Sequence, residues 1–266
     1  MNVASVVDPE LAAMAQVPGF ELSLENLPAA RDYLLEMLAV PAQALSSAAV
    51  AVEERHIPGE GSAPAVRVII YRPVSAALAT PAILEIHGGG FVMGVPEQSD
   101  GHNLQLAETL GCVVVAVNYR LAPEASGMAA VDDCYTVLRW LYRDSATIGV
   151  DPQRIAVLGD SAGGGIAAGL VLLARDRGEV PIACQVLTYP MLDDRTGSTV
   201  DPGDYSGEFS WPRGRAFIGC CNALTLRRPA GRSASGRPCA VVHQAIECFG
   251  HFFGRARVVM AYPPEP

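Results

Sequence analysis

Short apolar runs alternate with amphipathic segments between residues 50 and 188, and this pattern predicts strands separated by helices. The apolar or alternating stretches predicted as strands are Val50–Ile57, Val66–Arg72, Ala82–Ile86, Cys112–Asn118, Arg154–Leu158 and Ile182–Thr188. Apolar residues at helical spacing predict helices over 99–110, 128–146 and 162–175. Strands that alternate with helices predict an α/β fold with a mostly parallel sheet flanked by helices.

The two ends of the chain differ from this middle part. Residues 8–47 have the apolar spacing of one or two amphipathic helices, with Leu34, Leu35 and Leu38 on a shared face. After Tyr189 the periodicity fades, and only 241–249 and 257–262 retain patterns of short regular elements. We therefore divide the chain into N-terminal helices (1–48), an α/β core (49–211) and an atypical tail (212–266), and we expect the sheet to end with its sixth strand.

Charge and hydropathy narrow the class of partners. The net charge is −9, which disfavours binding to nucleic acid or to an anionic membrane surface. The sequence has no run of eighteen apolar residues, and its first twenty residues lack the basic start of a signal peptide. We therefore expect a cytoplasmic protein without a membrane partner. Cys112, Cys134 and Cys184 lie within apolar patterns, so we expect small buried side chains rather than disulfides.

The tail has a different composition from the rest. Residues 212–266 contain 8 Arg and 2 acidic residues, a balance of +6, whereas residues 1–211 contain 11 Arg and 26 acidic residues, a balance of −15. Four of the 7 cysteines also lie in the tail, and the chain contains no lysine. A segment rich in Arg, Pro, Gly, Ala, Ser and Cys is typical of GC-rich DNA translated out of frame, so we hold the hypothesis that the tail is a frameshift product.

The residues 159–163 form a Gly-Asp-Ser-Ala-Gly motif with Ser161 at its centre. The motif follows a predicted strand and opens a predicted helix, which is the context of a serine nucleophile exposed on a strained turn. Its glycines leave room for the tight turn, and the helix N-terminus favours negative charge that develops near Ser161. A glycine-rich phosphate loop is the other interpretation, but no Lys follows the glycines.

A second motif, His-Gly-Gly-Gly-Phe, occupies residues 87–91 directly after a predicted strand. Its glycines leave backbone N–H groups bare, and such groups stabilise the oxyanion of acyl transfer. We therefore expect an oxyanion hole formed by Gly88, Gly89 and Gly90 together with the N–H of Ala162. His87 is expected to hold this loop rather than to act as the catalytic base.

Four motifs in order resemble one family. They are His-Gly-Gly-Gly-Phe at 87–91, Asn-Tyr-Arg-Leu-Ala-Pro-Glu at 118–124, Asp-Asp-Cys-Tyr at 132–135 and Gly-Asp-Ser-Ala-Gly-Gly at 159–164. Over residues 8–211 the chain is similar to the bacterial hormone-sensitive-lipase family of α/β-hydrolase esterases. The resemblance implies Ser161 as nucleophile, Gly89, Gly90 and Ala162 as oxyanion-hole donors, a helical cap, short-chain acyl esters as substrates and no cofactor. The family's Pro- and aromatic-containing stretch after Pro123-Glu124 is replaced here by Ala-Ser-Gly-Met.

The remaining two members of a catalytic triad lack a clear counterpart. The chain order Ser, Asp, His requires an acid and a base after Ser161, yet no Asp follows Asp204. His251, within His-Phe-Phe, is the candidate base, and its resemblance to the family's His-Gly-Phe is faint. Activity is therefore expected to be impaired, and a catalytically silent hydrolase fold that binds a small molecule is the alternative. A zinc site formed by Cys239, His243, Cys248 and His251 is disfavoured by its spacing.

Overall fold

The computed structural model describes residues 8, 10, 22–38, 47–75, 79–125, 128–192 and 257–259. Its helices are α2 (Leu27–Leu38), η4 (Pro96–Ser99), α3 (Asp100–Leu110), α4 (Ala129–Arg143), α5 (Ser145–Ile148) and α6 (Ser161–Arg177). Its strands are β1 (Val50–Ile57), β2 (Val66–Pro73), β3 (Thr80–Ile86), β4 (Val113–Asn118), β5 (Val150–Asp160), β6 (Cys184–Thr188) and β7 (Arg257–Val259).

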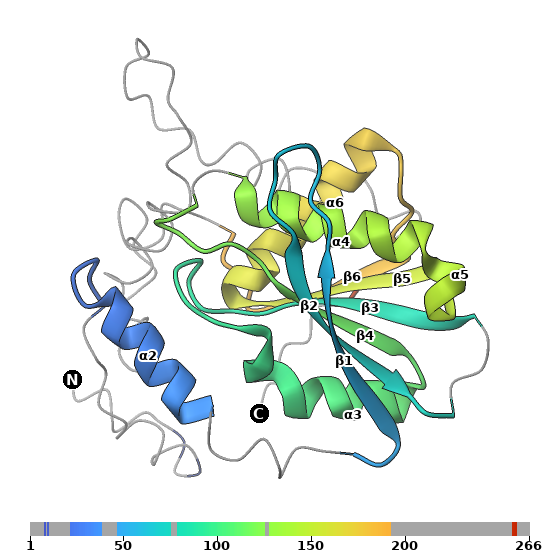
Figure 1. Cartoon of the computed structure of the whole chain (residues 1–266), viewed down its shortest axis with the longest axis horizontal. Coiled ribbons are helices and arrows are strands. Elements are labelled where there is room, and N and C mark those ends of the chain that lie inside the picture. The colour runs from blue at the N-terminus through green and yellow to red at the C-terminus, as the bar shows by residue number, and fades with distance from the viewer. Residues whose placement is uncertain are drawn as a thin grey trace.

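The strands form one mixed, mostly parallel sheet in the order β1-β2-β4-β3-β5-β6-β7. The pairs β1–β2 and β2–β4 are antiparallel, and all later pairs are parallel. Figure 1 shows α3 on one side of the sheet and α4 and α6 on the other. The predicted α/β class is therefore confirmed, and it takes the form of a three-layer arrangement.

The alternating side chains of the central strands supply both layers of the core. Val113, Val115 and Val117 of β4 pack in the cluster that contains α4 and α6, whereas Val114 and Ala116 pack with α3. All five of these side chains are fully buried. A strand that is covered on both faces needs apolar residues at every position, which explains the continuous apolar run of β4.

The structure corrects the predicted end of the sheet. Arg257–Val259 pairs in parallel with Cys184–Val186, so β6 is followed by a seventh strand and its outer edge is partly covered. The expectation of a sheet that ends with the sixth strand is wrong because the short element indicated within 257–262 pairs with β6, and this pairing has no local signal in the sequence. The predicted helix over 128–146 also divides, since α4 ends at Arg143 and the single turn α5 follows it.

The N-terminal helix α2 packs on the loops that follow β3 and β4. Leu22, Leu27 and Ala30 form a buried cluster with the loop residues Val92, Met93 and Ala122, and Leu34 packs against this cluster. In Figure 1, α2 lies beside the end of the sheet from which those loops emerge. The predicted face of Leu34, Leu35 and Leu38 is wrong, because Leu35 is 49% exposed. Residues 27, 30 and 34 face the protein instead, at helical spacing.

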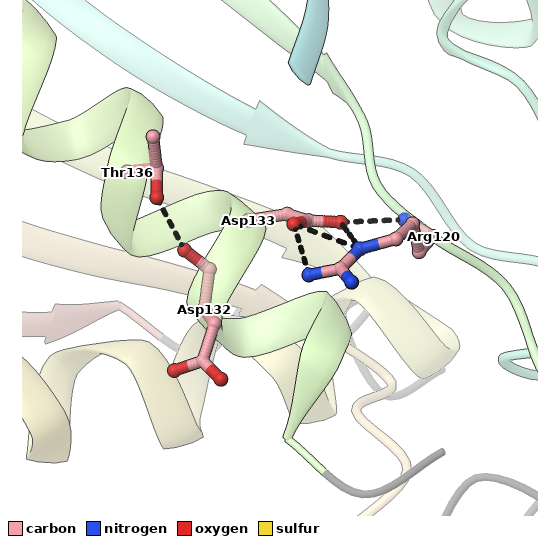
Figure 2. Close-up of polar contacts among 4 residues, drawn as sticks. All are labelled: Arg120, Asp132, Asp133 and Thr136. Atoms are coloured by element: carbon pink, nitrogen blue, oxygen red, sulfur yellow. Dashed lines mark hydrogen bonds and ion pairs between the residues drawn. The ribbon is translucent and has the colours of Figure 1, made fainter. Parts of the chain in front are cut away.

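An ion pair with a buried carboxylate joins α4 to the segment after β4 (Figure 2). The Asp133 side chain is 4% exposed. Its carboxylate accepts hydrogen bonds from the guanidinium of Arg120 at 2.7 Å and from the main-chain N–H of the same residue at 2.9 Å. Figure 2 shows the neighbouring Asp132 turned away from this pair. The Asp132-Asp133 motif thus contains one structural acid and one exposed acid.

The outer strand β1 differs from the buried strands. Only its first and last residues are buried, and the residues between them are exposed or half-buried. Within this strand Glu53 pairs with Arg55, and Glu54 pairs with Arg67 of β2. β1 and β2 form an antiparallel hairpin in which Ile57 pairs with Val66.

Two further expectations concern cysteines and membrane contact. Cys112 and Cys134 are buried free thiols, as predicted, whereas Cys184 is half-buried. Burial raises the pKa of all three thiols. Among the described residues, no helix combines the length and the hydrophobicity that a bilayer crossing requires.

Candidate active site

Ser161 lies at a sharp turn between β5 and α6. Strand β5 ends at Asp160, and α6 begins at Ser161 with a φ of 51°. This left-handed conformation is rare for a residue with a side chain and is typical of a nucleophile on a strained elbow. A Cβ at Gly159 would lie 2.3 Å from the carbonyl oxygen of Gly163, and one at Gly163 would lie 2.0 Å from that of Ile86. Both positions therefore require glycine.

The glycine loop, residues 88–93, forms a second tight turn. Gly89 and Gly90 have φ values of 120° and 62°. The carbonyl oxygen of Gly89 accepts hydrogen bonds from the N–H groups of Val92 and Met93 at 3.2 and 3.0 Å. A Cβ at Gly89 would lie 2.0 Å from the carbonyl oxygen of Met93. This turn brings the backbone closer to itself than any other residue type permits.

The sheet brings the elbow and the glycine loop together. Strands β3 and β5 are parallel neighbours, and Ile86 pairs with Gly159, so the two carboxyl ends meet at one edge. A Cβ at Gly163 would also lie 2.5 Å from the carbonyl oxygen of His87, which shows that α6 packs directly on the start of the loop. The predicted residues Ser161, Ala162 and Gly88–Gly90 are thus neighbours, whereas His251 and His243 lie outside the described residues.

His87 is buried at the base of the loop. Its Nδ1 lies 2.7 Å from the carbonyl oxygen of Gly88, and its ring stacks on Tyr119 with the ring centroids 4.2 Å apart. The Tyr119 hydroxyl donates to the carbonyl oxygen of His87 at 2.8 Å. Burial lowers the pKa of His87 to about 4. These contacts agree with the predicted role of His87, which is to hold the loop rather than to exchange protons with substrate.

Arg31 of α2 ties the helix to the outer side of the glycine loop. Its Nε donates to the carbonyl oxygen of Val92 at 2.8 Å, and one Nη donates to that of Ala122 at 2.8 Å. Its guanidinium also binds the carboxylate of Glu124 through two hydrogen bonds, of 2.7 and 2.9 Å. The N–H of Ala122 in turn donates to the carbonyl oxygen of Phe91. The loop is therefore held from the β4 side and from the N-terminal helix.

Beneath the loop, Glu85 of β3 is buried on the face that α3 covers. The Ser99 hydroxyl donates to its carboxylate at 3.0 Å. Burial raises the pKa of Glu85 to about 7, and the nearby charge of Asp160 acts in the same direction. Glu85 is therefore a buried acid that ionises near neutral pH, directly behind the active-site edge of the sheet.

We expect this acid to make stability depend on pH. The folded chain keeps the Glu85 proton up to about pH 7, whereas the unfolded chain loses it near 4.5, so stability falls as pH rises between these values. A difference of this size corresponds to about 3 kcal/mol. Glu85→Gln should remove the fall, as measured by urea unfolding at pH 5 and pH 8. The exposed Glu36→Gln is the control, and equal pH dependence in all three chains would contradict the prediction.

Three residues of the site were not singled out from the sequence. Asp160 and Tyr119 lie inside the recognised motifs at 159–164 and 118–124, so the motifs themselves could have indicated both residues. No sequence motif indicates Arg31, because its partners Val92, Ala122 and Glu124 lie 61 to 93 residues away in the sequence. Among the described residues, no group of His, Cys, Asp and Glu is arranged to hold a metal ion.

The parallel sheet, the serine elbow and the glycine loop together define an α/β-hydrolase. The α/β-hydrolase-fold family matches residues 83–237, more than half of the chain. Among solved structures, a bacterial heroin esterase superposes with a TM-score of 0.78 at 36% identity, covering 89% of this chain and 74% of that one. Esterase LipW from Mycobacterium marinum superposes with a TM-score of 0.75 at 31% identity, covering 86% and 71%.

Curated relatives narrow the family. Esterase LipI of Mycobacterium tuberculosis is 37% identical over 69% of this chain and 57% of its own length. Carboxylesterase NlhH of the same species is 40% identical over 52% of this chain and 43% of its own length. The chain belongs to the hormone-sensitive-lipase-like family of α/β-hydrolase esterases. It spans about half the length of the curated relatives that it matches.

Proposed function

We propose that this chain is a carboxylic ester hydrolase that acts on short-chain acyl esters with Ser161 as the nucleophile. The observation that supports the proposal is that Ser161, which has a φ of 51°, and the glycine loop lie together at one edge of the sheet. The names of the relatives support it, since they include a carboxylesterase of Mycobacterium tuberculosis and an ethyl acetate hydrolase of Pseudomonas putida.

The proposed chemistry begins with attack of the Ser161 Oγ on the ester carbonyl carbon. A base accepts the hydroxyl proton, and the carbonyl oxygen becomes an oxyanion that the N–H groups of Gly89, Gly90 and Ala162 bind. The positive end of the α6 dipole, at Ser161, stabilises the same negative charge. As this intermediate collapses, the base gives its proton to the leaving alkoxide, so the alcohol departs and an acyl group remains on Ser161. Water then attacks the acyl carbonyl carbon, which releases the carboxylic acid and restores the Ser161 hydroxyl.

His251 is the proposed base, and it remains a prediction because it lies outside the described residues. The identity of the triad acid also remains open, since no Asp follows Asp204. Without a working base, the oxyanion hole and substrate binding alone leave about 10³–10⁴-fold acceleration over water. We therefore propose an enzyme of impaired turnover unless His251 reaches Ser161.

Some finer assignments belong to the same proposal. The partner is a small-molecule ester, with no nucleic acid and no membrane partner, and the location is cytoplasmic. Residues 1–48, which include α2, form a cap beside the site, and residues 212–266 replace the usual end of the core. The anchoring of α2 on Val92, Met93 and Ala122 supports the cap assignment.

A combined labelling and turnover experiment tests the proposal. The full chain should hydrolyse p-nitrophenyl acetate above the rate in buffer, and a fluorophosphonate should form an adduct that peptide mass spectrometry locates on Ser161. His251→Ala should reduce kcat to the level expected without a base, whereas His243→Ala should leave it unchanged. A chain that binds p-nitrophenyl acetate without turnover and without an adduct would be the silent binding protein instead. Equal kcat in the His251→Ala and parent chains would exclude His251 as the base.

A further inference from the structure

Asp160 occupies the N-cap position of α6 without capping the helix. Its φ of −114° and ψ of 143° are typical of an N-cap residue. An aspartate at this position ordinarily accepts a hydrogen bond from an N–H of the first helical turn, yet the Asp160 side chain makes none. The carboxylate is therefore free to act on a different part of the molecule.

The carboxylate lies against the glycine loop instead. A Cβ at Gly88 would lie 2.6 Å from Oδ2 of Asp160, which places the carboxylate directly beside the backbone of Gly88. Burial raises the pKa of Asp160, and the main-chain N–H groups of Asp160 itself and of Gly88 favour the ionised carboxylate and act in the opposite direction. Gly88 is buried, so this N–H needs an acceptor within the protein.

We propose that Asp160 is a positioning residue that clamps the oxyanion loop to the nucleophile elbow through the Gly88 N–H. The proposal rests on the proposed esterase function and adds a role for the residue next to the nucleophile. Asp160 is covalently bonded to Ser161, and Gly88 is covalently bonded to Gly89. The clamp therefore fixes the distance between the attacking hydroxyl and the proposed donors Gly89 and Gly90 more directly than any other contact described at this site.

The clamp also explains why the first glycine of the loop is a glycine. Unlike Gly89 and Gly90, Gly88 does not have a positive φ, so its backbone conformation alone does not require glycine. The space that a side chain would need is occupied by the Asp160 carboxylate, at 2.6 Å, and by its main-chain oxygen, at 3.3 Å. The residue pair 88 and 160 is therefore coupled sterically as well as through the proposed clamp.

The expected kinetic signature is a loss of kcat with little change of KM. Ester binding in the ground state does not need the oxyanion donors, whereas the transition state does, so a displaced loop lowers the chemical step. A displacement of about 1 Å typically costs about 100-fold in rate. Asp160→Ala should lower kcat for p-nitrophenyl acetate by about this factor, with KM within about threefold.

Two further variants separate positioning from a general loss of folding. Asp160→Asn keeps an oxygen acceptor for the Gly88 N–H, so we expect kcat within about fivefold of the parent chain. Gly88→Ala disrupts the same contact from the side of the loop and should lower kcat as Asp160→Ala does. The double variant should be no slower than Asp160→Ala alone, because removal of the carboxylate at position 160 leaves room for the new Cβ, and contacting residues are not additive. Asp151→Asn, at the other end of β5 and bound to Arg154, is the matched control and should leave kcat unchanged.

Amide hydrogen exchange at Gly88 in the full chain provides a readout that is independent of turnover. Asp160→Ala should increase the exchange rate of the Gly88 amide, whereas Asp160→Asn and Asp151→Asn should not. If the parent chain shows no turnover that depends on Ser161, the proposed function fails and the exchange rates alone decide the clamp. Unchanged Gly88 exchange in Asp160→Ala would overturn the clamp, and so would equal losses of kcat in Asp160→Ala and Asp160→Asn. Fully additive losses in the double variant would overturn it as well.

Discussion

Ser161→Ala is expected to abolish hydrolysis of p-nitrophenyl acetate beyond the residual rate of the binding site. Removal of the nucleophile from a triad enzyme with a working base lowers kcat by about 10⁶-fold, because no other group forms the acyl intermediate. If His251 does not serve as the base, the parent chain already lies near the residual rate and the loss is correspondingly smaller. The effect should fall on kcat, since the serine hydroxyl contributes little to binding of the uncharged ester. The backbone of the elbow should not change, because the strain at residue 161 is set by Gly159 and Gly163 on either side.

The measurement compares initial rates of the parent chain, Ser161→Ala and Ser75→Ala at equal concentration. Ser75 lies on an exposed turn after β2 and serves as the matched serine control. The circular dichroism spectra of the three chains should superpose. An unchanged rate in Ser161→Ala would remove Ser161 from the mechanism and favour hydrolysis by a contaminant or by a different nucleophile.

Arg120→Ala is expected to cost about 1.5–3 kcal/mol of unfolding free energy, because it leaves the buried Asp133 carboxylate without its cationic hydrogen-bond partner. The Asp133 side chain is 4% exposed and that of Arg120 is 38% exposed, so water that takes the place of the guanidinium solvates the carboxylate only in part (Figure 2). Of the contacts that Asp133 makes in Figure 2, only the one with the main-chain N–H of residue 120, at 2.9 Å, would remain. Domains of this kind are stable by about 5–15 kcal/mol, so the loss is a large share of the total.

Urea unfolding followed by circular dichroism measures this difference. Asp132→Asn is the control, since Asp132 is the exposed neighbour on the same helix turn and a surface substitution stays within about 0.5 kcal/mol. The double variant Arg120→Ala with Asp133→Asn should recover part of the loss, because it removes the buried charge. A loss below about 1 kcal/mol in Arg120→Ala would show that the pair does not act as a buried ion pair.

The sequence predicted the elements that have strong local patterns. β1, β2 and β4 were predicted to within one residue, because β-branched runs and alternation are local signals. The start of β5 was missed by four residues, since Asp151, Pro152 and Gln153 read as a turn. Val150 pairs with Thr80 and Ile155 pairs with Ala82, so residues 151–154 form an irregularity between two paired positions of one strand. Such pairing depends on the partner strand and not on the residues themselves.

The candidate site also contains features that local sequence patterns predict and features that they do not predict. The elbow and the glycine loop could be predicted because each needs glycines at fixed spacing for steric reasons. The contact of Arg31 with Val92 and the contact of Asp160 with Gly88 join segments 61 and 72 residues apart in the sequence, and no local pattern encodes them. The pairing of Arg257–Val259 with β6 is of this kind too, as three residues have too little periodicity to indicate a partner.

The exposed charges along β1 bear on how copies of the chain meet in concentrated solution. An outer strand offers unpaired N–H and C=O groups to any extended segment of another molecule, and charged side chains oppose such strand addition. Glu53, Glu54 and Arg55 occupy the exposed centre of β1. A second copy that docked there in the antiparallel sense would have to desolvate these charges. Intermolecular sheet extension, and the aggregation that follows from it, is therefore disfavoured at this edge.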